Sequence, residues 1–452
     1  MSRARVDAEQ TGLLGTLRQF FALQRDVLVL SLAMFAFSLG FQMTSRFLPE
    51  YLVALGASGF VVGLFGTVGN VISAVFPYPG GAISDRIGSR YALTLFGLLS
   101  TLGFGIWLVA PTLGAISVAG LTVQPWVWIF VGLLFAQGWK SFGLGATFAV
   151  VKQATDPSRL AAGFASTETV RRTAFLIGPV VAAVLIDLHP AFTVGFRYVL
   201  AVAVGVGVIG TVAQHLLYDA SEDALGDSFA GIDQIKRDLR ELPDPLRPLL
   251  VGDTLVRFAN GMVYVFFVLV ITQFYEVGFE TTVSLAGFSS PIDLSPPAFF
   301  GALLGVEMLV ALLSMIPAAK AAERVGLKPV VAVGFAVYAL FPVVLIGGPA
   351  VLAPAIPLQW AMVLIFAFSG LRFAGLPSHK ALIVGPAEQG AGGRVTGTYY
   401  LLRNTIVIPS AALGGFLWEF VSPEIAFTIA AVIGLVGTGY FLVFGEEFAA
   451  YL

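Results

Sequence analysis

Residues Gly81–Arg90 read GAISDRIGSR, and this polar stretch lies between two long apolar segments. A degenerate copy, AKAAERVGLK, occupies residues Ala319–Lys328 in the second half of the chain. Each copy has an acidic residue, an adjacent Arg, a Gly two positions on and a Lys or Arg two positions after that. A compact polar stretch that twice interrupts hydrophobic sequence predicts a short loop between membrane helices, once in each half of a duplicated chain. We call these stretches the first and second cassettes.

The composition is that of a membrane protein. The 452 residues are 57% hydrophobic and 12% charged, with a mean hydropathy of +0.89, whereas soluble domains carry about 25% charged residues. A water-soluble core could not bury this much apolar surface, but lipid can cover it. The absence of cysteine excludes a disulfide framework and a thiolate site. The net charge of -2 does not discriminate between functions.

About twelve apolar segments are long enough to cross roughly 30 Å of hydrocarbon as helices. The predicted fold is therefore an all-α membrane protein of two pseudo-symmetric bundles with about six helices each. The predicted spans are residues 27–55, 59–84, 91–111, 126–151, 160–186, 196–217, 251–275, 298–318, 330–348, 358–384, 395–420 and 425–444. The predicted domains are an N-terminal segment (1–26), a first bundle (27–217), a linker (218–250) and a second bundle (251–452).

The positions of Lys and Arg predict the orientation. The N-terminal segment, both cassettes, the loop near Lys152 and Arg159, and the linker carry basic residues. The loops on the opposite side, residues 112–125, 276–297, 349–357 and 421–424, contain neither Lys nor Arg. Because cytoplasmic loops are enriched in these residues, both termini are predicted to be cytoplasmic in a multi-pass protein of the cell membrane.

The linker has one helical pattern of its own. Residues 228–242 place apolar side chains at helical spacing, and Pro243 and Pro245 follow. One interpretation is an amphipathic helix that lies on the membrane surface between the two bundles. The alternative is a passive linker, and the sequence does not choose between them.

The first cassette resembles the signature loop of the major facilitator superfamily, which joins the second and third helices of that fold. The family pattern is Gly-x-Leu-x-Asp-Arg-x-Gly-Arg-Arg, and Ile83 and Ser89 are the departures from it in this chain. Together with the predicted spans, the central linker and the second cassette, the resemblance covers nearly the whole chain. It implies a secondary transporter that works by alternating access.

A repeat inside the sequence supports two related halves. Residues Gly138–Lys140 (GWK) match residues Gly370–Arg372 (GLR), and the same offset pairs Asp156 with Glu388 and Arg171 with Arg403. Duplicated halves of transporters place a binding site at their interface, near the middle of the membrane.

Charged residues inside apolar spans are costly in lipid, so they should face protein or water and mark a functional site. Cations outnumber carboxylates among them, which favours a cavity of positive potential for an anionic or carboxylate-bearing substrate. The alternative is structural, with the carboxylates paired to nearby Arg residues. The predicted substrate- or ion-binding residues are Lys140, Arg171, Arg372, Arg403, Glu307 and Arg46.

Glu307 is the first candidate for a proton carrier, because a buried carboxyl can take up a proton when it loses an Arg partner. Glu168 is the second candidate. His379 and His215 lie near predicted cytoplasmic ends of helices, where an interfacial position is expected instead of a place in a proton relay.

The resemblance implies a gate at the cassettes. Asp85 would contact the start of the eleventh helix, near residues 393–396, when the cytoplasmic side is closed. A carboxylate is stabilised at a helix N-terminus by the helix dipole. By symmetry Glu323 would contact the start of the fifth helix. The predicted gating residues are Gly81, Asp85, Arg86, Gly88, Arg90, Glu323, Arg324 and Gly326.

The sequence does not predict an enzyme, because it lacks a phosphate-binding Gly-x4-Gly-Lys-Ser/Thr loop and a Cys/His cluster. The expected partners are a small-molecule substrate, a coupling ion (a proton) and the lipid bilayer, with no cofactor, metal or nucleic acid. One alternative is a multidrug-type proton antiporter, since Gly178 and Pro179 resemble the fifth-helix motif of proton-driven exporters. The other is a transport-inactive sensor or lipid-handling protein of the same fold.

Overall fold

The structure is a computed structural model that describes residues 25–118, 121–142, 160–218, 243–285, 288–384 and 392–447. The N-terminal half contains α3 (Arg25–Ser45), α4 (Leu48–Ala54), α5 (Gly59–Val75), α6 (Pro77–Ile87), α7 (Ser89–Leu113), β1 (Ile116–Val118), β2 (Leu121–Val123), α8 (Val127–Ala136), the π-helix η1 (Gly138–Phe142), α10 (Leu160–Ile186) and α11 (Phe192–Leu217).

The C-terminal half begins with α13 (Leu246–Val263), which continues through η3 (Tyr264–Phe266), α14 (Phe267–Leu269) and η4 (Val270–Phe274). It then contains β3 (Phe279–Leu285), β4 (Phe288–Leu294), α15 (Pro296–Val325), α16 (Leu327–Leu352), α17 (Leu358–Gly370), η5 (Leu371–Phe373), α18 (Leu376–Val384), α19 (Gly392–Val407), α20 (Ser410–Phe420) and α21 (Pro423–Phe444).

The helical membrane architecture predicted from the sequence is confirmed. In the described part of the chain, 9 helices are long and apolar enough to cross a membrane, and Gly59–Val75 and Arg172–Ile186 are shorter apolar helices. The full count of about twelve spans stays a prediction. Helix α10 has the predicted bounds, whereas α13 begins at Leu246, before the predicted domain boundary at residue 251. The predicted linker helix, residues 228–242, lies outside the described residues.

Many large apolar side chains remain exposed on the outer faces of the helices, among them Ile209, Leu313 and Val443. Such a surface is costly in water but is the surface that lipid requires. The core lies between the helices, where Phe104, Trp107 and Phe196 are fully buried.

Several of the long helices are broken, and proline accounts for some of the breaks. The break between α5 and α6 falls at Phe76, and Pro77 follows it. The break between α19 and α20 contains Pro409, which directly precedes Ser410. Proline has no N–H to donate and clashes with the preceding turn, so a helix ends or kinks there. Broken helices inside a membrane protein mark places where the backbone faces protein or a wet cavity.

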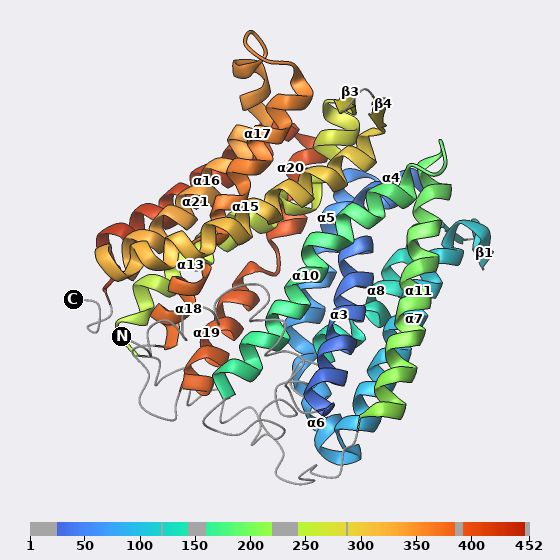
Figure 1. The fold of residues 1–452 in the computed structure, drawn as a ribbon, viewed down its shortest axis with the longest axis horizontal. Coiled ribbons are helices and arrows are strands. Elements are labelled where there is room, and N and C mark those ends of the chain that lie inside the picture. Colours follow the sequence, from blue (N-terminus) through green and yellow to red (C-terminus); the bar gives the residue numbers. More distant parts are fainter. Residues whose placement is uncertain are drawn as a thin grey trace.

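The two ends of the molecule differ, as Figure 1 shows. Antiparallel pairs β1–β2 and β3–β4 lie at one end, which we call the hairpin end. These strands fall within the predicted loops 112–125 and 276–297, and their pairing satisfies backbone polar groups of these segments. The junctions α6–α7 and α15–α16, which contain the cassettes, lie at the other end, which we call the cassette end.

The two halves contact each other at the hairpin end. The Phe300 ring packs edge-on against Phe47 of the other half, with 5.8 Å between centroids. Helices α5 and α20 pack so closely that a Cβ on Gly63 would lie 2.4 Å from the carbonyl oxygen of Ala411. Carboxylates also accept hydrogen bonds from neutral donors across the halves: Glu50 from Thr272 (2.5 Å) and Gln273 (3.1 Å), Asp187 from the N–H of Ser295 (3.3 Å), and Glu419 from the N–H of Gly59 (2.9 Å).

Candidate functional site: an arginine-lined cavity between the halves

The repeat-related cations Lys140 and Arg372 both lie where a helix loses its α geometry. Lys140 is in η1, directly after α8, and Arg372 is in η5, directly after α17. The glycine before Arg372 also has a packing role, because a Cβ on Gly370 would lie 2.5 Å from the carbonyl oxygen of Glu307. The close approach of α15 and α17 at this glycine brings the Arg372 and Glu307 side chains together.

Arg372 and Glu307 form a buried ion pair. Nη2 of Arg372 contacts Oε1 of Glu307, and the Ser369 hydroxyl donates a 2.7 Å hydrogen bond to the same oxygen. Arg372 is 3% exposed and Glu307 is 2% exposed. Nε and Nη1 of Arg372 have no hydrogen-bond partner among the described residues. A buried donor without a partner is costly, so these nitrogens are a place where a ligand oxygen would be stabilised.

Arg372 lines a cavity of about 320 Å³ between the two halves. Arg46 and Arg172 reach this cavity from the N-terminal half, and Arg257 and Arg372 reach it from the C-terminal half. The Arg46 guanidinium lies 4.2 Å from the ring centroid of Tyr264, a cation–π contact that joins the halves. The remaining lining residues are Phe175, Asn260, Tyr264, Met308, Met315, Tyr338, Phe373 and Leu376.

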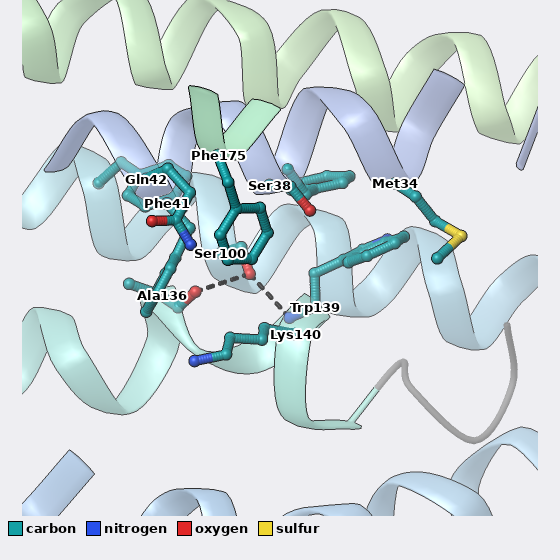
Figure 2. A pocket seen from close by; sticks show the side chains of 11 residues that line it. Met34, Ser38, Phe41, Gln42, Ser100, Ala136, Trp139, Lys140 and Phe175 are labelled. Carbon is teal, nitrogen blue, oxygen red and sulfur yellow. Dashed lines mark hydrogen bonds between the residues drawn. The ribbon is translucent and has the colours of Figure 1, made fainter. Parts of the chain in front are cut away.

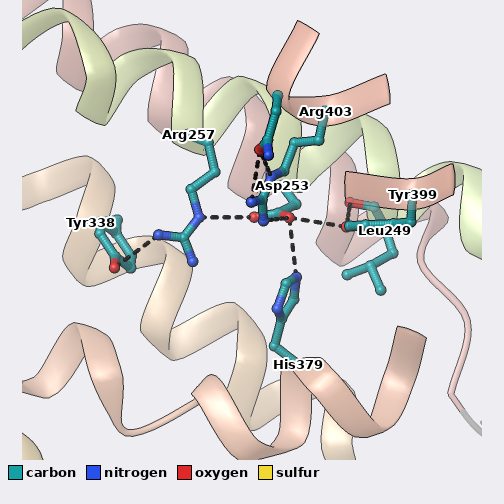
Figure 3. A network of polar contacts seen from close by, with 8 residues as sticks. Leu249, Asp253, Arg257, Tyr338, His379, Tyr399 and Arg403 are labelled. Atoms are coloured by element: carbon teal, nitrogen blue, oxygen red, sulfur yellow. Dashed lines mark hydrogen bonds and ion pairs between the residues drawn. The ribbon is translucent and has the colours of Figure 1, made fainter. Parts of the chain in front are cut away.

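A second polar cluster centres on Asp253 in α13, and Figure 3 shows its members converging on the carboxylate. Asp253 is fully buried. Oδ1 accepts a 3.2 Å hydrogen bond from Nε of Arg257. Around Oδ2 lie Nη1 of Arg403 (3.1 Å), the Tyr399 hydroxyl (3.1 Å) and Nε2 of His379 (3.2 Å). We call these five residues the Asp253 cluster.

Tyr338 connects the Asp253 cluster to the Glu307–Arg372 pair. Its hydroxyl accepts a 2.9 Å hydrogen bond from Nη1 of Arg257, and its ring centroid lies 5.1 Å from Cζ of Arg372. Two further cavities adjoin the first, of about 550 Å³ and about 240 Å³, and Arg257 lines all three. Arg403 lines both of the additional cavities. The arginines therefore line neighbouring cavities that share Arg257.

Lys140 does not join these arginines. It lines a separate cavity of about 50 Å³ within the N-terminal half, with its ammonium 4.2 Å from the ring centroid of Phe41. Figure 2 shows the adjacent Ser100 hydroxyl, which donates to the carbonyl of Ala136 (3.1 Å) and accepts from the N–H of Trp139 (2.8 Å). The side chains of the predicted site residue Arg171 and of Glu168 lie outside the described residues.

The cassette glycines are required by the backbone. Gly88 has φ 84° and Gly326 has φ 90°, values that residues with a side chain rarely adopt. Nε of Arg90 donates a 2.8 Å hydrogen bond to the carbonyl of His215 at the end of α11. Arg86, Glu323 and Arg324 are exposed, Gly81 belongs to α6, and the side chain of Asp85 lies outside what the structure describes.

Two features were misjudged or missed from the sequence. His379 was expected at an interface, but it is 3% exposed beside Asp253, because α18 packs inside the C-terminal half against α16 and α19. Asp253 and Arg257 were not selected, since they fall near the start of a predicted span. Their signal was present: an acidic and a basic residue four positions apart in an apolar helix form a pair on one face.

The fold and the buried polar site define a helical, multi-pass membrane protein with the architecture of secondary transporters. The Major Facilitator Superfamily model matches residues 30–295, which is more than half of the chain. The protein therefore belongs to the major facilitator superfamily.

Individual relatives are distant. An uncharacterized MFS-type transporter of Mycobacterium tuberculosis is 28% identical over 196 residues, which cover 43% of this chain and 42% of the relative. The chain thus matches less than half of that relative's length. Similar solved structures include a bacterial homologue of the iron transporter ferroportin in an inward-facing state (TM-score 0.71, 12% identity, 93% of this chain and 99% of that chain). A POT family transporter in complex with 5-aminolevulinic acid has a TM-score of 0.69, with 15% identity over 96% and 98% of the two chains. At these identities the likeness shows the fold alone.

Proposed function

We propose that this protein is a secondary active transporter that moves a small, carboxylate-bearing anion across the cell membrane by alternating access, coupled to protons. The observation that carries the proposal is Arg372. It is buried, it lines the cavity between the halves, and two of its guanidinium nitrogens have no partner among the described residues. Each of those two nitrogens can donate a charge-assisted hydrogen bond to a carboxylate oxygen.

The surroundings of Arg372 support an anionic ligand of modest size. Arginines from both halves face one cavity, so a bound anion would contact both halves at once. A volume of about 320 Å³ lies near the lower limit for small-molecule sites. Tyr264, Tyr338 and Phe373 line the same space and offer aromatic surface to the body of the ligand.

The contacts at the hairpin end identify the state of the transport cycle. If the cassette end is cytoplasmic, as the Lys and Arg distribution predicts, a molecule that is joined at the hairpin end is closed to the outside.

The orientation can be tested by labelling. If the hairpin end is extracellular, cysteine in place of the exposed Ala115, at the hairpin end, should react with an impermeant thiol reagent in intact cells. Cysteine in place of the exposed Ile87, within the first cassette, should not react. The reverse result would invert the orientation.

The substrate class can be tested on purified protein. Carboxylates such as benzoate should raise the unfolding temperature, whereas benzamide, amines and sugars should not, because a ligand stabilises the folded state that binds it. Arg46→Gln removes a cavity cation that has no carboxylate partner in the described chain, so it should weaken benzoate binding by about tenfold, and more at low salt.

The matched control is Lys320→Gln, which removes an exposed cation on α15 outside the cavity. Equal benzoate affinity in folded Arg46→Gln protein and in wild type would remove the anion proposal. Uptake into vesicles separates a transporter from a sensor, since a sensor binds without flux. Saturable binding of large apolar cations would instead favour the multidrug antiporter.

A further inference from the structure

Asp253 occupies a position that neither the anion site nor the cassettes explain. It is a fully buried carboxylate that lines none of the cavities described above. Its neighbours come from three helices: Arg257 from α13 itself, His379 from α18, and Tyr399 and Arg403 from α19. Two further helices pack on α13 here: α21 meets Gly252 through Gly437 and Phe441 and adds no charge there, and α16 adds Tyr338, whose hydroxyl accepts a hydrogen bond from Arg257.

The two arginines stand between Asp253 and the cavities. Arg257 and Arg403 each touch the carboxylate, yet both also line cavity space, with side chains 22% and 16% exposed. Each gives Asp253 a single nitrogen: Nε from Arg257 and Nη1 from Arg403. Nη2 of Arg257 has no hydrogen bond within the described chain. Neither pair therefore has the bidentate geometry in which guanidinium–carboxylate binding is strongest.

An anion in one of the two cavities that both arginines line could offer them the better geometry. Asp253 would then lose cationic partners inside the protein, and an isolated buried carboxylate is too costly to stay charged. Uptake of one proton on a carboxylate oxygen removes that cost. No bond other than O–H forms, and the net charge of the cluster with one bound carboxylate and one added proton equals that of the empty cluster.

We propose, on the basis of the function proposed above, that Asp253 is an internal competitor of the transported anion and the site of proton uptake. The charged carboxylate holds Arg257 and Arg403, and its protonation releases both to a substrate carboxylate. Binding of one carboxylate is thereby linked to binding of one proton.

His379 supplies the proton route. It lines the cavity of about 550 Å³, and its Nε2 lies 3.2 Å from Oδ2 of Asp253. An imidazole can accept a proton on one ring nitrogen and donate one from the other, which a guanidinium cannot do. His379 is thus a positioning and relay residue between the cavity and the carboxylate.

The first test compares the full-length protein with and without saturating benzoate. Infrared difference spectra on benzoate addition, recorded between about pH 5 and about pH 8, should contain the C=O band of a protonated, buried carboxylic acid, because the anion takes the arginines from Asp253. Asp253→Asn should lack that band, and the control Glu50→Gln, which neutralises a carboxylate at the hairpin end, should keep it. A band that persists in Asp253→Asn, or that is absent from wild type, would overturn the proposal.

The second test uses benzoate as the probe. At about pH 8, Asp253→Asn should bind benzoate about tenfold more tightly than wild type, and its affinity should no longer change with pH. His379→Gln should retain the equilibrium pH dependence of benzoate binding but slow the proton uptake that accompanies it. If Asp253→Asn does not fold, Arg403→Gln is used in its place. Arg403→Gln should bind benzoate more weakly than wild type and show a stronger C=O band than wild type at the same pH.

The outcomes separate the two proposals. A wild-type protein that binds no carboxylate would refute the proposed function, whereas one that binds benzoate without the Asp253 band would refute the protonation site alone. Benzoate binding that is equally pH-dependent in wild type and Asp253→Asn would refute the role of Asp253 as a competitor of the anion, while the anion site itself would stand.

Discussion

At the scale of single residues, Glu307 illustrates how a buried ion pair constrains its members. Its carboxylate contacts Arg372 and accepts a hydrogen bond from Ser369, and it lines none of the described cavities. Arg372, in contrast, faces the cavity. Glu307 therefore holds Arg372 in position. The sequence predicts Glu307 as a proton carrier, but Asp253 fits that role better, because His379 connects Asp253 to a cavity.

Removing only the cation of this pair should be costly. Arg372→Gln leaves the Glu307 carboxylate buried and unpaired, which is expected to cost about 3–5 kcal/mol of stability. The double variant Glu307→Gln/Arg372→Gln should recover most of that loss, because no uncompensated charge remains. Thermal unfolding of the purified variants measures both. Equal losses in the single and double variants would mean that the pair does not act as a unit.

Transport assays decide which carboxylate carries the proton. The Glu307→Gln variant should still accumulate substrate when a proton gradient is applied, since Asp253 and His379 are intact. The opposite pattern, in which Glu307→Gln loses accumulation but keeps substrate exchange, would return the coupling role to Glu307.

At the scale of elements, the second cassette is built around the start of α16. Leu327 and Lys328 begin that helix, and their N–H groups donate to the carboxylate of Glu447 at 3.1 and 2.9 Å. These donors have no partner within the helix, and the helix dipole favours a negative charge there. A Cβ on Gly326 would lie 2.4 Å from Oε2 of Glu447, so this glycine is needed for the contact as well as for its φ of 90°.

Glu447→Gln should therefore loosen the first turn of α16. The charge–dipole interaction is expected to contribute about 0.3–1 kcal/mol, so hydrogen exchange at Leu327 and Lys328 should become up to about fivefold faster. Exposed Glu446 provides the matched control, because Glu446→Gln changes the same charge one residue away. Identical exchange in the two variants would show that the carboxylate of Glu447 does not cap the helix.

At the scale of the whole molecule, alternating access requires that one end opens as the other closes. Contacts such as Glu50 with Thr272 hold the hairpin end together in this structure. For the opposite state, we propose the contact predicted from the sequence between Asp85 and the start of the eleventh helix. Each carboxylate would then stabilise a different state of the same cycle.

Neutralising these two carboxylates should shift the population in opposite directions. The distance between spin labels at Ala115 and Ala355, one in each half at the hairpin end, should lengthen in Glu50→Gln. In Asp85→Asn it should stay at the short, wild-type value, and the transport cycle should slow. Because the chain has no native cysteine, the two introduced cysteines are the only labelled sites. A shift toward longer distances in Asp85→Asn would contradict the assigned gate.

The sequence by itself determined the helical membrane architecture, the two cassettes and the repeat. These are local properties: the length of an apolar run, the spacing of charges and the φ that a glycine permits. Helix α10 has its predicted bounds, and Gly88 and Gly326 both take the conformation that only glycine adopts readily.

Only the tertiary structure decided which charges share a site. Lys140 and Arg372 are equivalent in the repeat, yet Arg372 faces the cavity between the halves and Lys140 faces a small cavity within one half. Asp253, His379 and Arg403 lie on three different helices and meet at one carboxylate. Helix packing sets such meetings, because it depends on which face of each helix is covered and on the close approaches that residues such as Gly370 allow.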